Sequence, residues 1–118
     1  MEAAIRAVNW LWGYLFFRES ELVTKEFTEK FLSSLYFHGK FIEKNLEYSP
    51  FGPNNHYLAD LVGLIYLGLL FKNTNEGRNW LRFGKEELHR EILRQVYPDG
   101  VDYEGSIPYH RLALELFL

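Results

Sequence analysis

Turn-forming residues are confined to two short segments of this chain, and this is what most limits the folds available to it. All four prolines lie within residues 49–53 and 98–108. Proline and clustered glycine interrupt helices and mark turns, whereas the long stretches outside these segments have helical spacing of apolar residues. No strand pattern appears. The sequence therefore predicts an all-α protein.

Five helices are expected from the apolar spacing and from residues suited to capping helix ends. Ser20 is the predicted cap of the second helix, and Asn73-Thr74-Asn75 offers caps for the fourth. The third helix is apolar on nearly all sides, which is typical of a buried inner helix. The predicted helices cover residues 2–18, 20–47, 56–71, 76–97 and 108 onward.

The fourth predicted helix is amphipathic, which indicates an outer, solvated helix. Glu86 and Arg90 are expected to form an ion pair one turn apart. The apolar stripe expected to face the core consists of Leu81, Leu88, Ile92 and Val96.

Long helices joined by turns predict stacked antiparallel helical hairpins, as in a toroid or solenoid. The last segment, "HRLALELFL", stops within an apolar helix. We therefore expect residues 1–118 to form a single helical domain that is a fragment of an incomplete (α/α) toroid. The isolated fragment is expected to self-associate, because these apolar side chains of the last helix lack partners: Leu112, Leu114, Leu116, Phe117 and Leu118.

Composition excludes several functional classes. The net charge is -3 with both signs interspersed, which does not favour nucleic-acid binding. The uncharged runs 7–17 and 61–71 are shorter than the roughly 18 residues that span a bilayer, and the first lacks the cleavage site of a signal peptide. There is no cysteine, so no disulfide or thiolate metal site is expected and the compartment is undetermined.

The two turn segments are expected to face each other. If the third and fourth helices form an antiparallel hairpin, the third and fifth helices start at the same end. The helix starts also point free amide donors to this end of the molecule, which we call the rim. The rim should therefore attract an anion such as a carboxylate. The rim gathers Asn54, Asn55, His56, Tyr57, Asp102, Tyr103, Glu104, Tyr109, His110 and Arg111.

Each rim residue also has a purely structural interpretation. Asn54 or Asn55 is a good N-cap, and Arg111 can pair with Glu115 one turn later. His56 fits a hydrogen-bonded structural histidine. The others can be core aromatics or solvated loop acids, namely Tyr109, Asp102 and Glu104.

Two motifs together carry a resemblance to a known family. The segments "GPNNHYLADLVGLIYLGLLF" and "EELHREILRQVYPDGVDYEGSIPYHRLALELFL", with Trp80 between them, closely resemble the heparinase II/III family of polysaccharide lyases, which is related to certain alginate lyases. The similarity covers nearly the whole chain, including "RAVNWLWG" and "FIEKNLE". An "NNH" followed by "DGxDYEGSxxYHR", with a hairpin between, is fairly specific.

The resemblance implies an incomplete helical toroid followed by a β-sandwich domain, in a protein that cleaves uronic-acid polysaccharides by β-elimination. It implies that Asn55, helped by His56, binds the uronate carboxylate and that Tyr109 protonates the leaving oxygen. It also implies that a second catalytic partner comes from a later part of the chain, so the isolated fragment is expected to be inactive. No metal or cofactor is implied, and a periplasmic or secreted parent is compatible. The remaining substrate-binding residues would be Asn54, Tyr57, Tyr103, Glu104, His110 and Arg111.

Physical chemistry agrees with these roles. Hydrogen bonds to the carboxylate stabilise the enolate-like charge of the elimination, and a tyrosine is a suitable proton donor. Two alternatives stay open. One is a noncatalytic glycan-binding or scaffold module. The other is a hydrolase using Asp102 and Glu104, which we rank last because carboxylates two residues apart do not flank a glycosidic bond.

Four aromatic side chains are candidates for stacking on sugar rings, a contact that aromatic faces favour. For the two tryptophans, packing in the core is the expected role. The candidates are Trp10, Trp12, Tyr57 and Tyr103.

Overall fold

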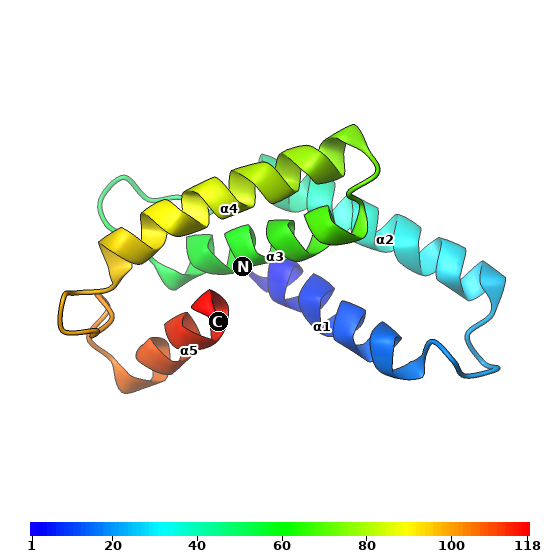
Figure 1. Ribbon diagram of the computed structural model, residues 1–118, viewed down its shortest axis with the longest axis horizontal. Coiled ribbons are helices and arrows are strands. Elements are labelled where there is room, and N and C mark those ends of the chain that lie inside the picture. The colour runs from blue at the N-terminus through cyan, green and yellow to red at the C-terminus, as the bar shows by residue number, and fades with distance from the viewer.

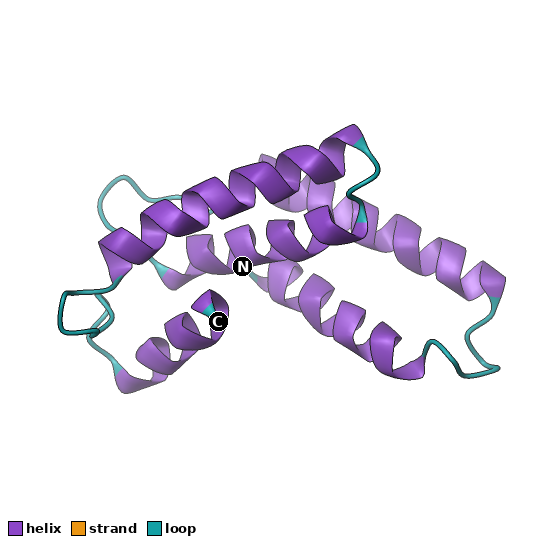
Figure 2. Cartoon of the chain, in the orientation of Figure 1, coloured by secondary structure: helices purple, strands orange, loops and turns teal.

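A computed structural model of all 118 residues contains five α-helices joined by loops, and no β-strand (Figures 1 and 2). The all-α prediction is confirmed. None of the helices combines the length and the hydropathy that a membrane span needs. The helices are α1 (Glu2–Phe17), α2 (Lys25–Lys44), α3 (Asn55–Leu70), α4 (Asn75–Gln95) and α5 (Ile107–Phe117).

Helix α3 is the centre of the fold. It packs against each of the other four helices, and Figure 1 shows α1 and α2 as one antiparallel hairpin and α3 and α4 as another. Ten of its sixteen residues are buried. The prediction of a buried inner helix follows from a nearly uncharged sequence, since each face of α3 meets another helix instead of water.

Capping residues set where the helices begin. The side chains of Asn54 and Thr74 accept hydrogen bonds from backbone N–H groups in the first turns of α3 and α4, as N-caps do. The predicted Ser20 cap is wrong, because α2 starts five residues later. Thr24 caps it by accepting from Phe27 N at 3.1 Å, while the Ser20 hydroxyl accepts from Leu22 within a turn.

The core lies where α1, α2 and α4 converge on α3. Trp80 is its largest side chain and lies against Gly39, where a Cβ would come within 2.5 Å of the indole ring. The prediction that Trp10 and Trp12 pack in the core is wrong, since they are 41% and 46% exposed. In α1 the fully buried residues are instead the small Ala4 and Ala7. The core cluster consists of Ala4, Ala7, Leu11, Leu35, Ile42, Leu64, Leu67 and Trp80.

The face that α4 buries differs from the predicted leucine stripe. Close approach to α3 selects small residues: a Cβ on Gly84 would lie 2.7 Å from Ile65, and one on Gly68 would lie 2.6 Å from the backbone of Leu81. Ile92 is consequently left at the edge and counts among the exposed side chains. The residues that α4 buries are Gly77, Trp80, Gly84, Glu91 and Gln95.

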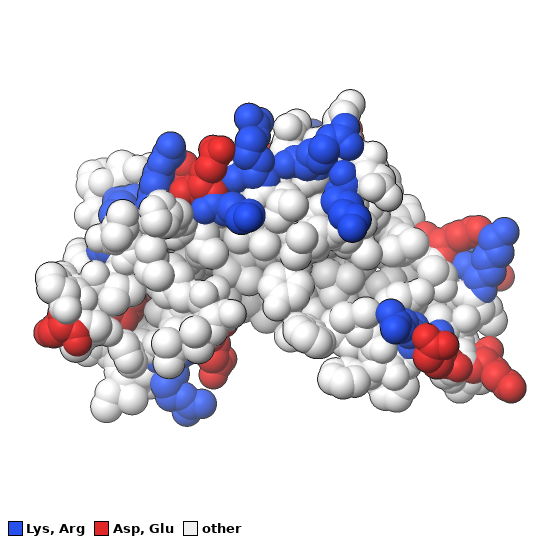
Figure 3. Space-filling view, in the orientation of Figure 1, with Lys and Arg blue, Asp and Glu red and all other residues white.

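The opposite face of α4 is charged, as expected for an outer helix. Figure 3 shows Lys and Arg side chains along it with acidic groups between them. The predicted pairing of Glu86 with Arg90 is not found. Arg90 instead pairs with Glu87, three residues before it, because both lie on the same strip of the helix surface.

Alanine at Gly68 is expected to destabilise the fold by about 1–3 kcal/mol, because the added methyl meets backbone atoms of α4 that cannot rotate away. Gly13 in α1 is the matched control, since a Cβ there meets nothing within 4 Å. Gly13→Ala should stabilise by up to about 1 kcal/mol through helix propensity. Urea unfolding of both variants measures this, and a stabilising Gly68→Ala would contradict the close packing.

Candidate functional site

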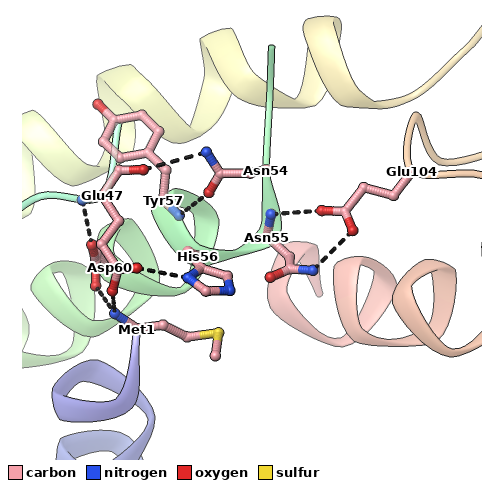
Figure 4. Close-up of polar contacts among 8 residues, drawn as sticks. All are labelled: Met1, Glu47, Asn54, Asn55, His56, Tyr57, Asp60 and Glu104. Carbon is pink, nitrogen blue, oxygen red and sulfur yellow. Dashed lines mark hydrogen bonds and ion pairs between the residues drawn. The ribbon is translucent and has the colours of Figure 1, made fainter. Parts of the chain in front are cut away.

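Two hydrogen bonds between Asn55 and Glu104 join the two turn segments. The backbone N–H of Asn55 donates to Glu104 Oε1 at 2.9 Å, and its side-chain amide donates to Oε2 at 3.1 Å (Figure 4). Asn55 is only 5% exposed. These bonds join the start of α3 to the loop before α5, so the starts of both helices lie at the same end of the molecule (Figure 1).

Asn54 has a structural role at this rim. Its side-chain oxygen accepts from Tyr57 N at 2.8 Å, and its amide donates to the backbone oxygen of Glu47 at 3.3 Å. It thus caps α3 and also holds the preceding loop. Asn54 and Asn55 therefore point to different partners, as Figure 4 shows.

His56 turns to a third partner, the Glu47 side chain. Its Nδ1 lies 2.6 Å from Glu47 Oε2. A carboxylate only accepts, so Nδ1 carries the proton and Nε2 is the nitrogen left free. Hydrogen bonds from the Met1 ammonium and from His56 lower the pKa of the Glu47 carboxyl. Buried Asp60 holds the backbone of Glu47 in place by accepting a hydrogen bond from Glu47 N at 2.9 Å.

Tyr57 is a buried residue of the rim. It is 4% exposed, and its hydroxyl donates to Glu87 at 3.1 Å. Its ring meets the Tyr48 ring edge-on, with centroids 5.3 Å apart. In this structure Tyr57 offers no ring face to a sugar. Burial, and then the negative charge of Glu87, raise the pKa of the Tyr57 hydroxyl, so this group stays neutral and is not a candidate base.

This raised pKa predicts alkaline instability. An unfolded tyrosine ionises near pH 10, while folded Tyr57 keeps its proton to higher pH. The stability that Tyr57 contributes is therefore complete below pH 10 and falls above it, by up to about 1.4 kcal/mol per pH unit. We expect Tyr57→Phe to lose less stability than the wild type between about pH 10 and 11. Urea unfolding at several pH values measures this. An equal fall of the unfolding free energy with pH in Tyr57→Phe and in the wild type would contradict the prediction.

The loop before α5 is held by its own backbone and by buried Asp102. Asp102 Oδ2 accepts from Glu104 N at 3.1 Å, and Asp102 N donates to His110 Nδ1 at 3.3 Å. The chain reverses at Gly100, whose φ of 87° suits glycine. Asp102 is buried and both oxygens of Glu104 are bonded to Asn55, so these two carboxylates are not placed to flank a glycosidic bond as a hydrolase requires.

The other predicted residues of α5 and of the loop before it are more exposed to solvent. Tyr109 lies in the first turn of α5 and is 48% exposed. Arg111 pairs loosely with Glu115 at 3.9 Å, so the structural interpretation of Arg111 holds. Tyr103 lies at the surface, with its ring 6.3 Å from that of Tyr97.

Gln95, the last residue of α4, holds both loops and was not predicted. Its buried side chain donates to the Asn54 carbonyl oxygen at 3.3 Å and to Glu91 at 2.9 Å. Its own carbonyl accepts from Tyr103 N at 2.7 Å. The one available sequence signal was a pair of polar residues, 91 and 95, one turn apart at the helix end.

The rim thus presents an amide, an imidazole and a phenol near two helix starts. Amide and imidazolium N–H groups suit a carboxylate, and a phenol can transfer a proton. No group of three or more His, Cys, Asp or Glu side chains is placed to hold a metal ion. Taken singly, these side chains are chemically suited to recognise an acidic group and to donate a proton.

Fold and rim together define an all-α domain with one polar edge. Comparison with known families matches all residues, 1–118, to the model described as "Heparinase II/III N-terminus". The chain therefore belongs to the heparinase II/III family, as its motifs indicated.

Two curated relatives support this placement. A heparin-sulfate lyase of Pedobacter heparinus is 30% identical over 102 residues, and one of Bacteroides stercoris is 35% identical over 101. Each alignment covers 86% of this chain and 15% of the relative. The chain therefore spans a small part of these proteins. No solved structure gives a significant match.

Proposed function

We propose that this chain is the N-terminal part of a polysaccharide lyase that cleaves a uronic-acid-containing polysaccharide by β-elimination. The family supports the lyase class, and both relatives are heparin-sulfate lyases. The observation that carries the proposal is the double hydrogen bond between Asn55 and Glu104, which ties the start of α3 to the loop that carries α5 and Tyr109. The parent would continue as an incomplete toroid and a β-sandwich.

Asn55 and His56 bind the uronate carboxylate in this proposal. Asn55 has a second amide N–H beyond the one given to Glu104. The free ring nitrogen of His56 is Nε2, since Nδ1 is held by Glu47, and Nε2 donates to the substrate when it carries a proton. Both donors stabilise the charge that moves onto the carboxylate when the neighbouring ring proton leaves.

Tyr109 supplies the proton for the leaving group. A base removes the proton beside the carboxylate, its electrons form the ring double bond, and the glycosidic C–O bond breaks. The departing oxygen takes the Tyr109 proton, which completes the balance without water. Tyr109 suits this role because its ring is half-exposed at the rim. The second partner comes from outside residues 1–118, so this segment alone is expected to be inactive.

Product analysis of the full-length protein tests the proposal. Uronate polymers of several kinds, including heparan sulfate and alginate, are incubated with the enzyme. Elimination leaves an unsaturated uronate that absorbs ultraviolet light, and this rise in absorbance is the expected result. New reducing ends without ultraviolet absorbance would show hydrolysis and overturn the proposal. Polymer that is bound but intact would establish the noncatalytic glycan-binding alternative.

A further inference from the structure

We propose that Glu104 is a positioning residue that sets the orientation of the Asn55 side-chain amide, and that it does not itself bind the polysaccharide. This inference rests on the proposed function, because it assigns Asn55 to the substrate carboxylate. It replaces the sequence-based expectation that Glu104 is a substrate-binding residue.

Three hydrogen bonds hold Glu104 in place. Both oxygens of Glu104 are engaged by one residue, at 2.9 Å from the Asn55 backbone nitrogen and 3.1 Å from its side-chain nitrogen. The backbone of Glu104 is also anchored, because its N–H donates to buried Asp102 at 3.1 Å. A group held at both of its oxygens and at its backbone is suited to orient a neighbour.

The orientation of the Asn55 amide decides what it can bind. The two ends of an asparagine side chain are similar in shape, but one donates and the other accepts. A carboxylate only accepts, so Glu104 forces the nitrogen of Asn55 to its own side. One N–H is then bonded to Glu104, and the second remains for an incoming anion. Without Glu104 the amide can turn over and present its oxygen, which repels a uronate carboxylate.

Electrostatics explain why Glu104 does not take the substrate acid itself. Two carboxylates do not bind each other, so Glu104 is unsuited to the acidic group of the sugar. At the start of α3 its charge is instead favoured by the N–H of Asn55 and by the positive end of the helix dipole. Glu104 thus acts on the substrate through Asn55.

A double-mutant cycle in the full-length enzyme tests this inference. Asn55→Ala should lower kcat by about 10²–10³, as loss of one donor to a developing charge does. Glu104→Ala should lower kcat by about 10²-fold through misplacement of Asn55. The double variant should be no slower than Asn55→Ala alone, because Glu104 has nothing left to position. Additive losses would show that Glu104 acts independently and would overturn the inference.

Two further variants separate orientation from shape. Glu104→Gln keeps the size but offers an N–H to Asn55, which favours the reversed amide, so its kcat should fall with KM changed less than about threefold. A rise in KM with unchanged kcat would mark direct substrate contact and overturn the inference. Glu86→Gln, on the exposed face of α4, is the control and should match wild type. Circular dichroism confirms that each variant is folded.

The cycle also distinguishes this inference from the proposed function. Wild-type enzyme that forms no ultraviolet-absorbing product would overturn the proposed function. Full elimination activity in Asn55→Ala would keep the lyase class, but it would remove Asn55 from the mechanism and overturn the inference. A slow Asn55→Ala combined with a fully active Glu104→Ala would keep the lyase assignment and would overturn only the positioning role.

Discussion

Tyr109→Phe in the full-length protein is expected to lower turnover by about 10²–10⁴-fold, the range that a general acid contributes. Only the hydroxyl is removed, and the half-exposed ring remains to pack at the rim. The glycosidic oxygen then leaves as an unprotonated alkoxide, which is a poor leaving group. Polymer binding should persist, because the proposed carboxylate ligands, Asn55 and His56, are unchanged.

Tyr97→Phe provides the matched control. Tyr97 follows α4, is as exposed as Tyr109 at 48%, and belongs to the loop at the same end of the molecule. The same loss of a hydroxyl there should leave ultraviolet product formation unchanged. Near wild-type turnover in Tyr109→Phe would remove Tyr109 from the mechanism. Equal losses in both variants would point to a general effect on the rim.

The arrangement of the loops was predictable because it depends on helix order alone. An antiparallel hairpin between α3 and α4 returns the chain to the end where α3 began, and the structure joins the two loops there through Asn55 and Glu104. The capping role of Asn54 was also predictable, since an asparagine before an apolar helical run is a standard N-cap. The roles of Asn55, His56 and Tyr109 in catalysis remain predictions.

Side-chain partners could not be predicted because they join residues far apart in sequence. Asn55 and Glu104 are 49 positions apart, and Gln95 reaches Asn54 across 41. The prediction of the buried face of α4 was wrong for a related reason. Its glycines pack against α3, so small size, which a hydrophobic pattern ignores, decided the orientation of the helix.

The largest effect on stability is expected from Trp80→Ala, which should lower the free energy of unfolding by about 3–5 kcal/mol. Trp80 is 1% exposed and its ring lies 5.6 Å from Tyr36 and 6.3 Å from Phe71. Alanine would leave a cavity among α2, α3 and α4 that these rings cannot fill without moving. Because Gln95 on α4 holds both loops of the rim, a shift of α4 would also loosen the candidate site.

Two further tryptophan variants show whether burial causes this loss. The Trp80 indole N–H is buried without a hydrogen-bond partner, which costs stability in the wild type. Trp80→Phe removes that group and keeps most of the ring volume, so it should change stability by less than about 1.5 kcal/mol. Trp12→Ala, at a half-exposed position in α1, should cost much less than Trp80→Ala. Urea unfolding measures all three, and an equal loss at both tryptophans would contradict the placement of the core beside Trp80.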